Sequence, residues 1–267
     1  MPAVEINKLR IQIARLGQYF DQPEEFYRGM RDLLELYLDR AYRPGLEVNS
    51  ASILPTYRPP ALVQRRLELE LISLTQAFPE QALGIADRLW LDTFLEPRML
   101  AVLILGQIPL SQAEDVLERL NRWATPDEDR SMLEALLDRG TFRLRLEGPD
   151  ALLELYESWL AHVDSARRSI GLKALLPLIK DPRFGNIPPI FSILFPLVRA
   201  ASSDLFNDLS SVLQALAERT PVETVYFLRQ VLSSPVSKDT PRLARRILPQ
   251  LNPAQQESLK TTLRTLT

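Results

Sequence analysis

Residues 164–172 read Asp-Ser-Ala-Arg-Arg-Ser-Ile-Gly-Leu, and variants of this stretch recur along the chain. Five of the six copies begin with arginine and continue with leucine, and those at residues 98, 130 and 168 place a small or apolar residue three positions after the arginine; the copy that starts near Leu205 is degenerate. The copies start near residues 65, 98, 130, 168, 205 and 242, so successive starts lie 33, 32, 38, 37 and 37 residues apart. A near-constant period of this size is typical of proteins that repeat one supersecondary unit.

The 267-residue chain is rich in helix formers. It contains 50 leucines, and arginine, glutamate, alanine and glutamine are also frequent; these residues fit a helix at little cost. Most of the 21 prolines fall at predicted helix starts, as in Thr125-Pro126 and Thr220-Pro221, where threonine is expected to cap the helix. Strict apolar–polar alternation is rare, and its clearest case, residues 141–147, has no strand partner. Fourteen helices are predicted, over 4–18, 23–42, 60–77, 79–92, 95–108, 110–124, 126–139, 149–162, 164–180, 188–201, 204–219, 221–233, 238–249 and 253–266.

These features predict an all-α protein. Short connections make successive helices antiparallel neighbours, and helix pairs that cannot bury both faces alone stack into a superhelix. We expect an α-solenoid of about six helix pairs over residues 60–267, preceded by an N-terminal helical cap and a long proline-containing loop over residues 1–59. The repeat resembles the HEAT-repeat family over roughly residues 60–266, which implies one continuous solenoid domain.

Several functional classes are disfavoured by composition. The chain has no cysteine, one histidine and a formal net charge of −2. Disulfide frameworks and thiol chemistry are excluded, and neither a metal site nor a cofactor is expected. The single histidine, His162, lies at the C-terminal end of a predicted helix, where contacts to terminal carbonyls and a general-base role are both open. We therefore expect a non-enzymatic binding or scaffold module in the cytoplasm, without membrane contact, whose concave surface most simply takes a protein partner.

Arginines that open the repeats are the first binding candidates. If each repeat has the same geometry, they line one ridge that tracks phosphates or an acidic peptide. Alternatively, each arginine bridges to an acidic residue or a helix C-terminus in the neighbouring repeat. The candidates are Arg65, Arg98, Arg130, Arg167, Arg168, Arg242, Arg245 and Arg246.

Charge is distributed unevenly along the chain. Residues 111–159 hold 12 acidic and 6 basic residues, whereas residues 160–267 hold 8 acidic and 14 basic residues. The basic C-terminal region is consistent with binding to nucleic acid. The alternative interpretation is that the charge is only unevenly distributed over a solvated surface. The loop from residue 43 to 59 adds Tyr57 and Arg58, residue types that are enriched in binding hot spots, unless it serves only as a connector.

A second resemblance is to the alkylpurine DNA glycosylases built from HEAT-like repeats. It is carried by Leu89-Trp90, by Glu96-Pro97-Arg98-Met99-Leu100-Ala101 and by Ala166-Arg167-Arg168-Ser169. The resemblance implies base excision by an aspartate beside tryptophan, for which Asp127 with Trp123 is the candidate here. The alternative to a scaffold is therefore a DNA-repair-like protein, either a glycosylase of this type or a non-catalytic binder of duplex DNA.

Overall fold

The computed structural model describes residues 5–38 and 52–264, and all regular structure in these ranges is helical. The prediction of an all-α protein is thus confirmed. The chain forms two compact units, Met1–Gly148 and Pro149–Thr267. The first unit contains α1 (Ile6–Gly17), α2 (Pro23–Leu36), α3 (Ala61–Ala77), α4 (Pro79–Trp90), α5 (Leu95–Leu105), α6 (Ala113–Trp123), α7 (Arg130–Asp138) and α8 (Phe142–Glu147). The second contains α9 (Pro149–Leu160), α10 (Ser165–Lys180), α11 (Pro188–Arg199), α12 (Phe206–Arg219), α13 (Pro221–Leu232), α14 (Thr240–Ile247) and α15 (Pro253–Arg264).

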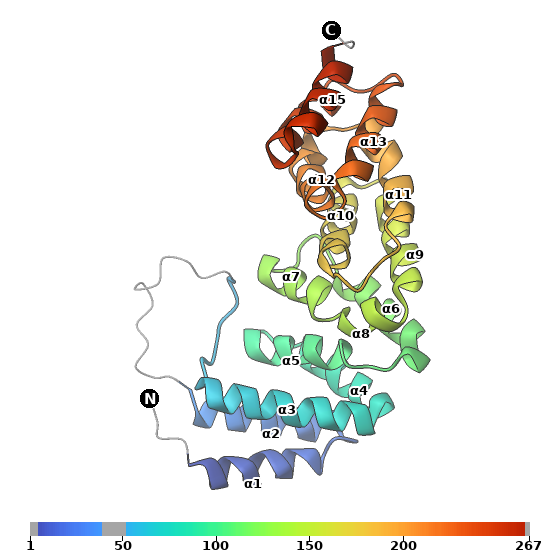
Figure 1. Ribbon diagram of the computed structural model, residues 1–267. Helices are drawn as coiled ribbons and strands as arrows, with labels where there is room; N and C mark the ends of the chain where they lie inside the picture. Colours follow the sequence, from blue (N-terminus) through green and yellow to red (C-terminus); the bar gives the residue numbers. More distant parts are fainter. Residues whose placement is uncertain (1–4, 39–51, 265–267) are drawn as a thin grey trace. The chain divides into compact units, whose positions relative to one another are not determined.

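Each unit stacks its helices in two layers (Figure 1). In the first unit α3 packs between α1 and α5, α5 continues to α7, and α2 packs on α4. The predicted N-terminal cap helices therefore belong to the same compact unit as the first repeats. In the second unit α10, α12 and α14 form one layer, while α9, α11, α13 and α15 form the other. Such stacked helix pairs are the arrangement expected of an α-solenoid.

Apolar periodicity explains which helix faces are buried. In α9 the buried residues are Leu152, Leu153, Tyr156, Trp159 and Leu160, the i, i+3, i+4 pattern of one helix face. No single helix in the described ranges is long and apolar enough to cross a membrane. Helix α5 and residues 110–123 have the length and composition of a membrane span only when they are taken together, and the chain bends by 108° between them.

Three details of the helix predictions are wrong. Residues 142–147, which lie between two predicted helices, form α8. Helix α7 begins at Arg130 and not at Pro126, because the carboxylate of Asp129 caps it by accepting the amides of Ser131 and Met132. Helix α13 does begin at Pro221, but the Thr220 hydroxyl donates to the carbonyl of Leu216 and does not cap.

Proline also lies inside two helices. Pro177 is in the last turn of α10 and Pro196 in the last turn of α11, so these two residues do not mark helix starts. Residues 39–42 of the predicted second helix, and residues 43–51 of the long loop, lie outside the described residues.

Candidate nucleic-acid interface

An aromatic and ionic cluster joins α4, α5 and α6 in the first unit. The rings of Trp90 and Trp123 stack in parallel with centroids 4.5 Å apart. The guanidinium of Arg98 lies 4.2 Å from the centroid of the Trp90 ring and forms an ion pair with Glu128. The Arg98 side chain is only 11% exposed. Arg98 therefore bridges neighbouring repeats, the second of the two roles that the sequence left open.

The two residues suggested for base excision have different environments. Trp123 is 4% exposed and its ring is occupied by the stack with Trp90. Asp127 is exposed in the turn between α6 and α7. Stacking on a DNA base requires an accessible aromatic face, so Trp123 would have to leave this packing before it could contact DNA.

Asp129 organises the same turn. Besides capping α7, it accepts the amide of Ile53 at 3.0 Å. Burial of the carboxyl opposes its ionisation, but hydrogen bonds from Ser131, Ile53 and Met132 outweigh that effect and hold the pKa of Asp129 below its ordinary 3.8. The turn is thus held by Asp129 and Glu128, while Asp127 is left exposed.

The segment from residue 52 to 60 is fixed against the start of α5. The carboxylate of Glu96 accepts the amides of Tyr57 and Arg58 at 3.0 and 2.8 Å. The Tyr57 ring stacks on Phe94 at 4.3 Å, and its hydroxyl accepts a hydrogen bond from Arg31. Burial of its hydroxyl raises the pKa of Tyr57. Tyr57 is therefore a packing residue in this structure.

Arg58 completes this attachment. Its φ of 51° lies in the left-handed region, which non-glycine residues seldom adopt. The Glu96 carboxylate holds that conformation by binding two successive amides. Both predicted loop residues thus serve to attach the segment to α5.

The other predicted arginines of the first unit are exposed. Arg65 lies on the surface of α3. The Arg130 side chain is 88% exposed and pairs with Glu134 one turn along α7. An exposed pair at this spacing contributes only a few tenths of a kcal/mol, so it does not fix Arg130 in place.

The N-terminal ends of α10, α12 and α14 lie in a row in the second unit. The hydroxyl of Ser169 in α10 donates to Asp208 in α12 at 2.5 Å. Arg242 and Arg246 of α14 lie 5.3 and 6.0 Å from the centroid of the Phe206 ring at the start of α12. These contacts bring residues from three helices to one edge of the unit.

We call Arg168, Arg242, Arg245 and Arg246 the arginine edge. On α14 the three arginines occupy positions i, i+3 and i+4, so they share one helix face, and all three are exposed. Arg242 also pairs with the buried carboxylate of Asp239 at 2.7 Å. The Nε of Arg168 is buried and has no hydrogen-bond partner among the described residues.

Arg167 and His162 have local roles in the same unit. The Arg167 guanidinium lies 4.5 Å from the ring of Trp159, and burial lowers the pKa of Arg167 from its ordinary value. His162 is exposed, and its Nδ1 accepts the amide of Asp164 in the turn before α10. In the described ranges no three acidic or histidine side chains are grouped so that they could hold a metal ion.

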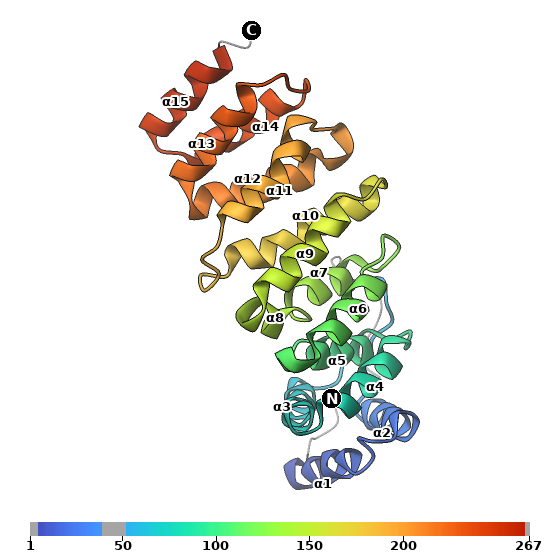
Figure 2. The same ribbon diagram turned by 90° about the vertical axis from the view of Figure 1, so that its right-hand side faces the viewer.

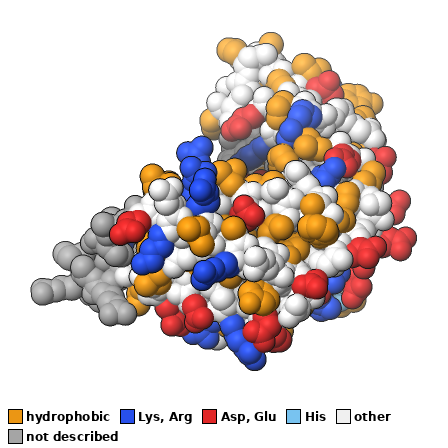
Figure 3. Space-filling view, turned by 90° about the horizontal axis from the view of Figure 1, so that it is seen from below, with side chains coloured by type: hydrophobic (Ala, Val, Ile, Leu, Met, Phe, Trp, Pro, Cys, Tyr) orange, Lys and Arg blue, Asp and Glu red, His pale blue; other side chains and the backbone are white. Residues whose placement is uncertain are grey.

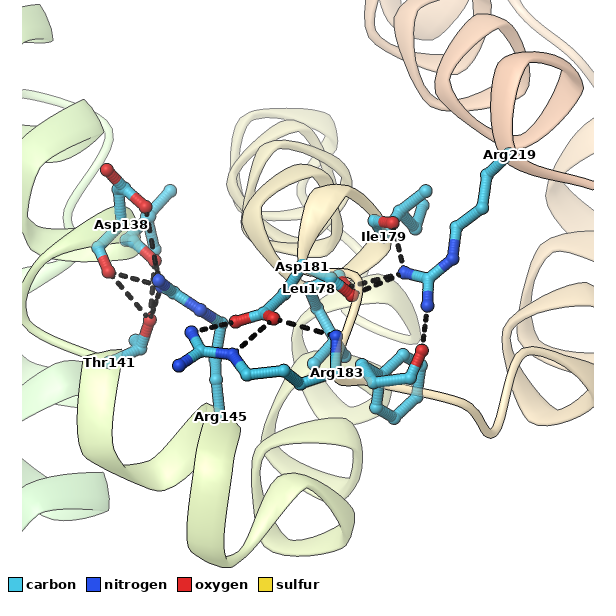
Figure 4. A network of polar contacts seen from close by, with 10 residues as sticks. Asp138, Thr141, Arg145, Leu178, Ile179, Asp181, Arg183 and Arg219 are labelled. Atoms are coloured by element: carbon cyan, nitrogen blue, oxygen red, sulfur yellow. Dashed lines mark hydrogen bonds and ion pairs between the residues drawn. The ribbon is translucent and has the colours of Figure 1, made fainter.

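Two arginines that the sequence did not single out contact helix C-termini. Arg219 of α12 donates to the carbonyls of Leu178, Ile179, Asp181 and Phe184 at the end of α10 and just after it (Figure 4). Within the first unit, Arg145 donates to the last carbonyls of α7 and to the hydroxyl of Thr141 (Figure 4). The repeat pattern did not indicate either arginine, because Arg219 lies in the last turn of α12 and Arg145 lies in a segment that is not predicted to be helical.

Surface charge does not form one large patch on the face drawn in Figure 3, where basic and acidic side chains are interspersed. Over residues 149–267 the sequence has 14 basic and 11 acidic residues. Three of the acidic residues, Asp150, Glu154 and Glu157, are exposed on α9, in the layer opposite to the arginine edge. Basic charge in this unit is therefore concentrated in the layer that contains the edge.

Comparison with known proteins adds one finding. The model of the DNA alkylation repair enzyme family matches residues 65–247, about two thirds of the chain. The matched region begins at the first arginine-led repeat start and includes the last. Neither the curated proteins nor the solved structures gave a match. The extent of the family match shows that this chain belongs to the DNA alkylation repair enzyme family.

Proposed function

We propose that the protein binds duplex DNA and that the arginine edge of the second unit contacts the phosphates. The observation that carries this proposal is the row formed by the starts of α10, α12 and α14, which presents Arg168, Arg242, Arg245 and Arg246 in a chain of a DNA repair family. Arginine pairs with phosphate oxygens through two parallel hydrogen bonds, and helix N-termini favour anions.

The dimensions of the edge suit a DNA backbone. Packed helices lie about 8–10 Å apart, so the step from α10 across α12 to α14 spans about 16–20 Å. Base pairs in duplex DNA rise about 3.4 Å each, and the edge therefore matches about five or six base pairs. No base-reading group is required for this mode of binding, because phosphate contacts position a protein without specifying sequence.

Acidic residues close to the edge are largely engaged within the protein. Asp239 pairs with Arg242, and Asp208 accepts a hydrogen bond from Ser169. Arg245 and Arg246 are exposed, and neither forms an ion pair within the described residues. Charge available to a phosphate therefore comes chiefly from the outer face of α14.

The test is a fluorescence anisotropy titration of the whole chain with a 20-base-pair duplex between 50 and 200 mM salt. Four phosphate contacts correspond to a slope of about −3.6 in log K against log salt, so affinity falls by roughly 100-fold over this range. Replacing Arg242, Arg245 and Arg246 by glutamine is expected to make the slope shallower by about 2.7. A matched variant with glutamine at Arg10, Arg15 and Arg28, all exposed in α1 and α2, should retain the wild-type slope.

A second candidate is base excision, which the family match favours. Asp127 follows Trp123 by four residues and is exposed, so its carboxylate is accessible to a substrate. Release of a methylated purine from alkylated DNA, compared between wild type and Asp127→Asn, tests this role. Loss of release in the variant supports excision by Asp127. Equal release in the two proteins assigns excision to another residue, and no release in either protein leaves DNA binding as the proposed function.

A further inference from the structure

The layer of the second unit that does not carry the arginine edge contains an apolar groove. Figure 2 shows α9, α11 and α13 side by side. Between α11 and α13 a groove of about 570 Å³ is lined mainly by Phe191, Val222, Tyr226 and Phe227. Val222 is 66% exposed and Tyr226 is 70% exposed, and they lie one turn apart on α13. Two large apolar side chains exposed together beside a groove are typical of a binding surface.

The other side of α11 is acidic. A hollow of about 640 Å³ between α9 and α11 is lined by Asp150, Glu154 and Glu157. The three acids occupy positions i, i+4 and i+7, one face of α9. Glu223, next to Val222, adds a fourth carboxylate to the apolar groove. Within the described residues none of the four forms an ion pair with Lys, Arg or His, and no basic residue lines either hollow.

The apolar groove and the acidic hollow together indicate what kind of ligand fits this surface. Like charges spaced this way on one helix repel each other by a few tenths of a kcal/mol per pair, and a cationic ligand relieves that repulsion. Phosphates are repelled by the same carboxylates, so nucleic acid does not suit this surface. An apolar anchor fits the groove between α11 and α13, while basic side chains fit the acidic face of α9.

We propose that this surface, the α9–α11–α13 groove, binds a basic peptide segment of a partner protein that carries one large apolar anchor. The two hollows lie on either side of α11, about one helix spacing or 8–10 Å apart. An extended peptide rises about 3.3 Å per residue, so the basic residues are expected about three positions from the anchor. The inference does not depend on DNA binding, because it uses a different layer of the unit.

The experiment screens a random library of twelve-residue peptides, displayed on phage, for binding to the whole chain. Enriched peptides should combine arginine or lysine with a Phe, Leu or Trp about three positions away. A synthetic, fluorescein-labelled copy of the most enriched peptide then measures affinity. Glu154→Lys with Glu157→Lys should weaken its binding at least tenfold, and Tyr226→Ser about tenfold. The matched charge reversal on α6, Glu114→Lys with Glu118→Lys, changes two exposed glutamates and should leave affinity within twofold.

Circular dichroism and urea unfolding establish that each variant is folded, and neither measurement depends on the proposed DNA binding. The proposal is overturned if no peptides are enriched, if enriched peptides are acidic, or if the groove variants bind them as wild type does. It is also overturned if sedimentation shows a dimer that Glu154→Lys with Glu157→Lys dissociates, because a second copy of the chain then occupies the groove.

Discussion

Replacing Arg219 should destabilise the second unit more than replacing any exposed arginine. The guanidinium donates to four carbonyls at the end of α10 and in the following turn, including that of Asp181 at 2.7 Å. Helix ends leave carbonyls without intrahelical partners, and here a side chain from the next helix of the layer provides the donors. A hydrogen bond from a charged donor contributes about 1.5–3 kcal/mol, and leaving buried acceptors unpaired costs a similar amount.

Because the four contacts share one guanidinium and some carbonyls will regain water, we expect Arg219→Ala to cost about 2–3 kcal/mol. The stability of Arg219→Lys should lie between that of wild type and that of Arg219→Ala, since an ammonium has three donors and no planar fork. Urea unfolding followed by circular dichroism measures the effect. Arg229→Ala, on the exposed side of α13, is the control and should change stability by less than about 0.5 kcal/mol. If Arg219→Ala is as stable as that control, the claim that this arginine fastens α10 to α12 is wrong.

Three further predictions concern the first unit. In Gly106→Ala a Cβ would lie 2.0 Å from the carbonyl oxygen of Arg139, so we expect a loss of about 2 kcal/mol or more in urea unfolding, from overpacking against backbone; wild-type stability would contradict the close approach. Arg98→Ala removes the partner of Glu128 and the cation over Trp90, and should cost about 3 kcal/mol, with a change in tryptophan fluorescence. Glu128→Gln in the same background should then have little additional effect, and full additivity would refute the pairing. Asp129→Ala should cost about 1–2 kcal/mol at pH 7 through loss of the cap. Because the folded-state pKa of Asp129 is lowered from 3.8, its stabilisation is present above pH 3.8 and is lost as pH falls through the folded value; a difference between variant and wild type that stays constant from pH 7 to pH 2.5 would contradict this assignment.

Local sequence patterns predicted the helices because the responsible interactions are short in range. Leu152, Tyr156 and Trp159 mark the buried face of α9 by spacing alone. The start of α7 shows where such reasoning fails, since Thr125-Pro126 and Asp129 both suit a helix start. Asp129 prevails because its carboxylate also accepts an amide from residue 53, a contact over 76 residues that no local pattern contains.

The site was less predictable than the fold. An arginine that opens a repeat has the same sequence context whether it is buried like Arg98 or exposed like Arg245. What separates them is the loop residue Glu128, 30 positions away, which reaches Arg98. Arg219 escaped notice for the same reason, because its four acceptors are backbone carbonyls 35 to 41 residues away and carry no side-chain signature. Tyr57 has the residue type of a binding hot spot, but stacking on Phe94 buries it.

Salt dependence of DNA binding tests the central claim most directly. The whole chain and the variant with glutamine at Arg242, Arg245 and Arg246 are titrated with the same 20-base-pair duplex from 50 to 200 mM salt. We expect a steep loss of affinity for wild type and a slope shallower by about 2.7 for the variant. Equal slopes for the two proteins, or no binding by wild type at 50 mM salt, would contradict it.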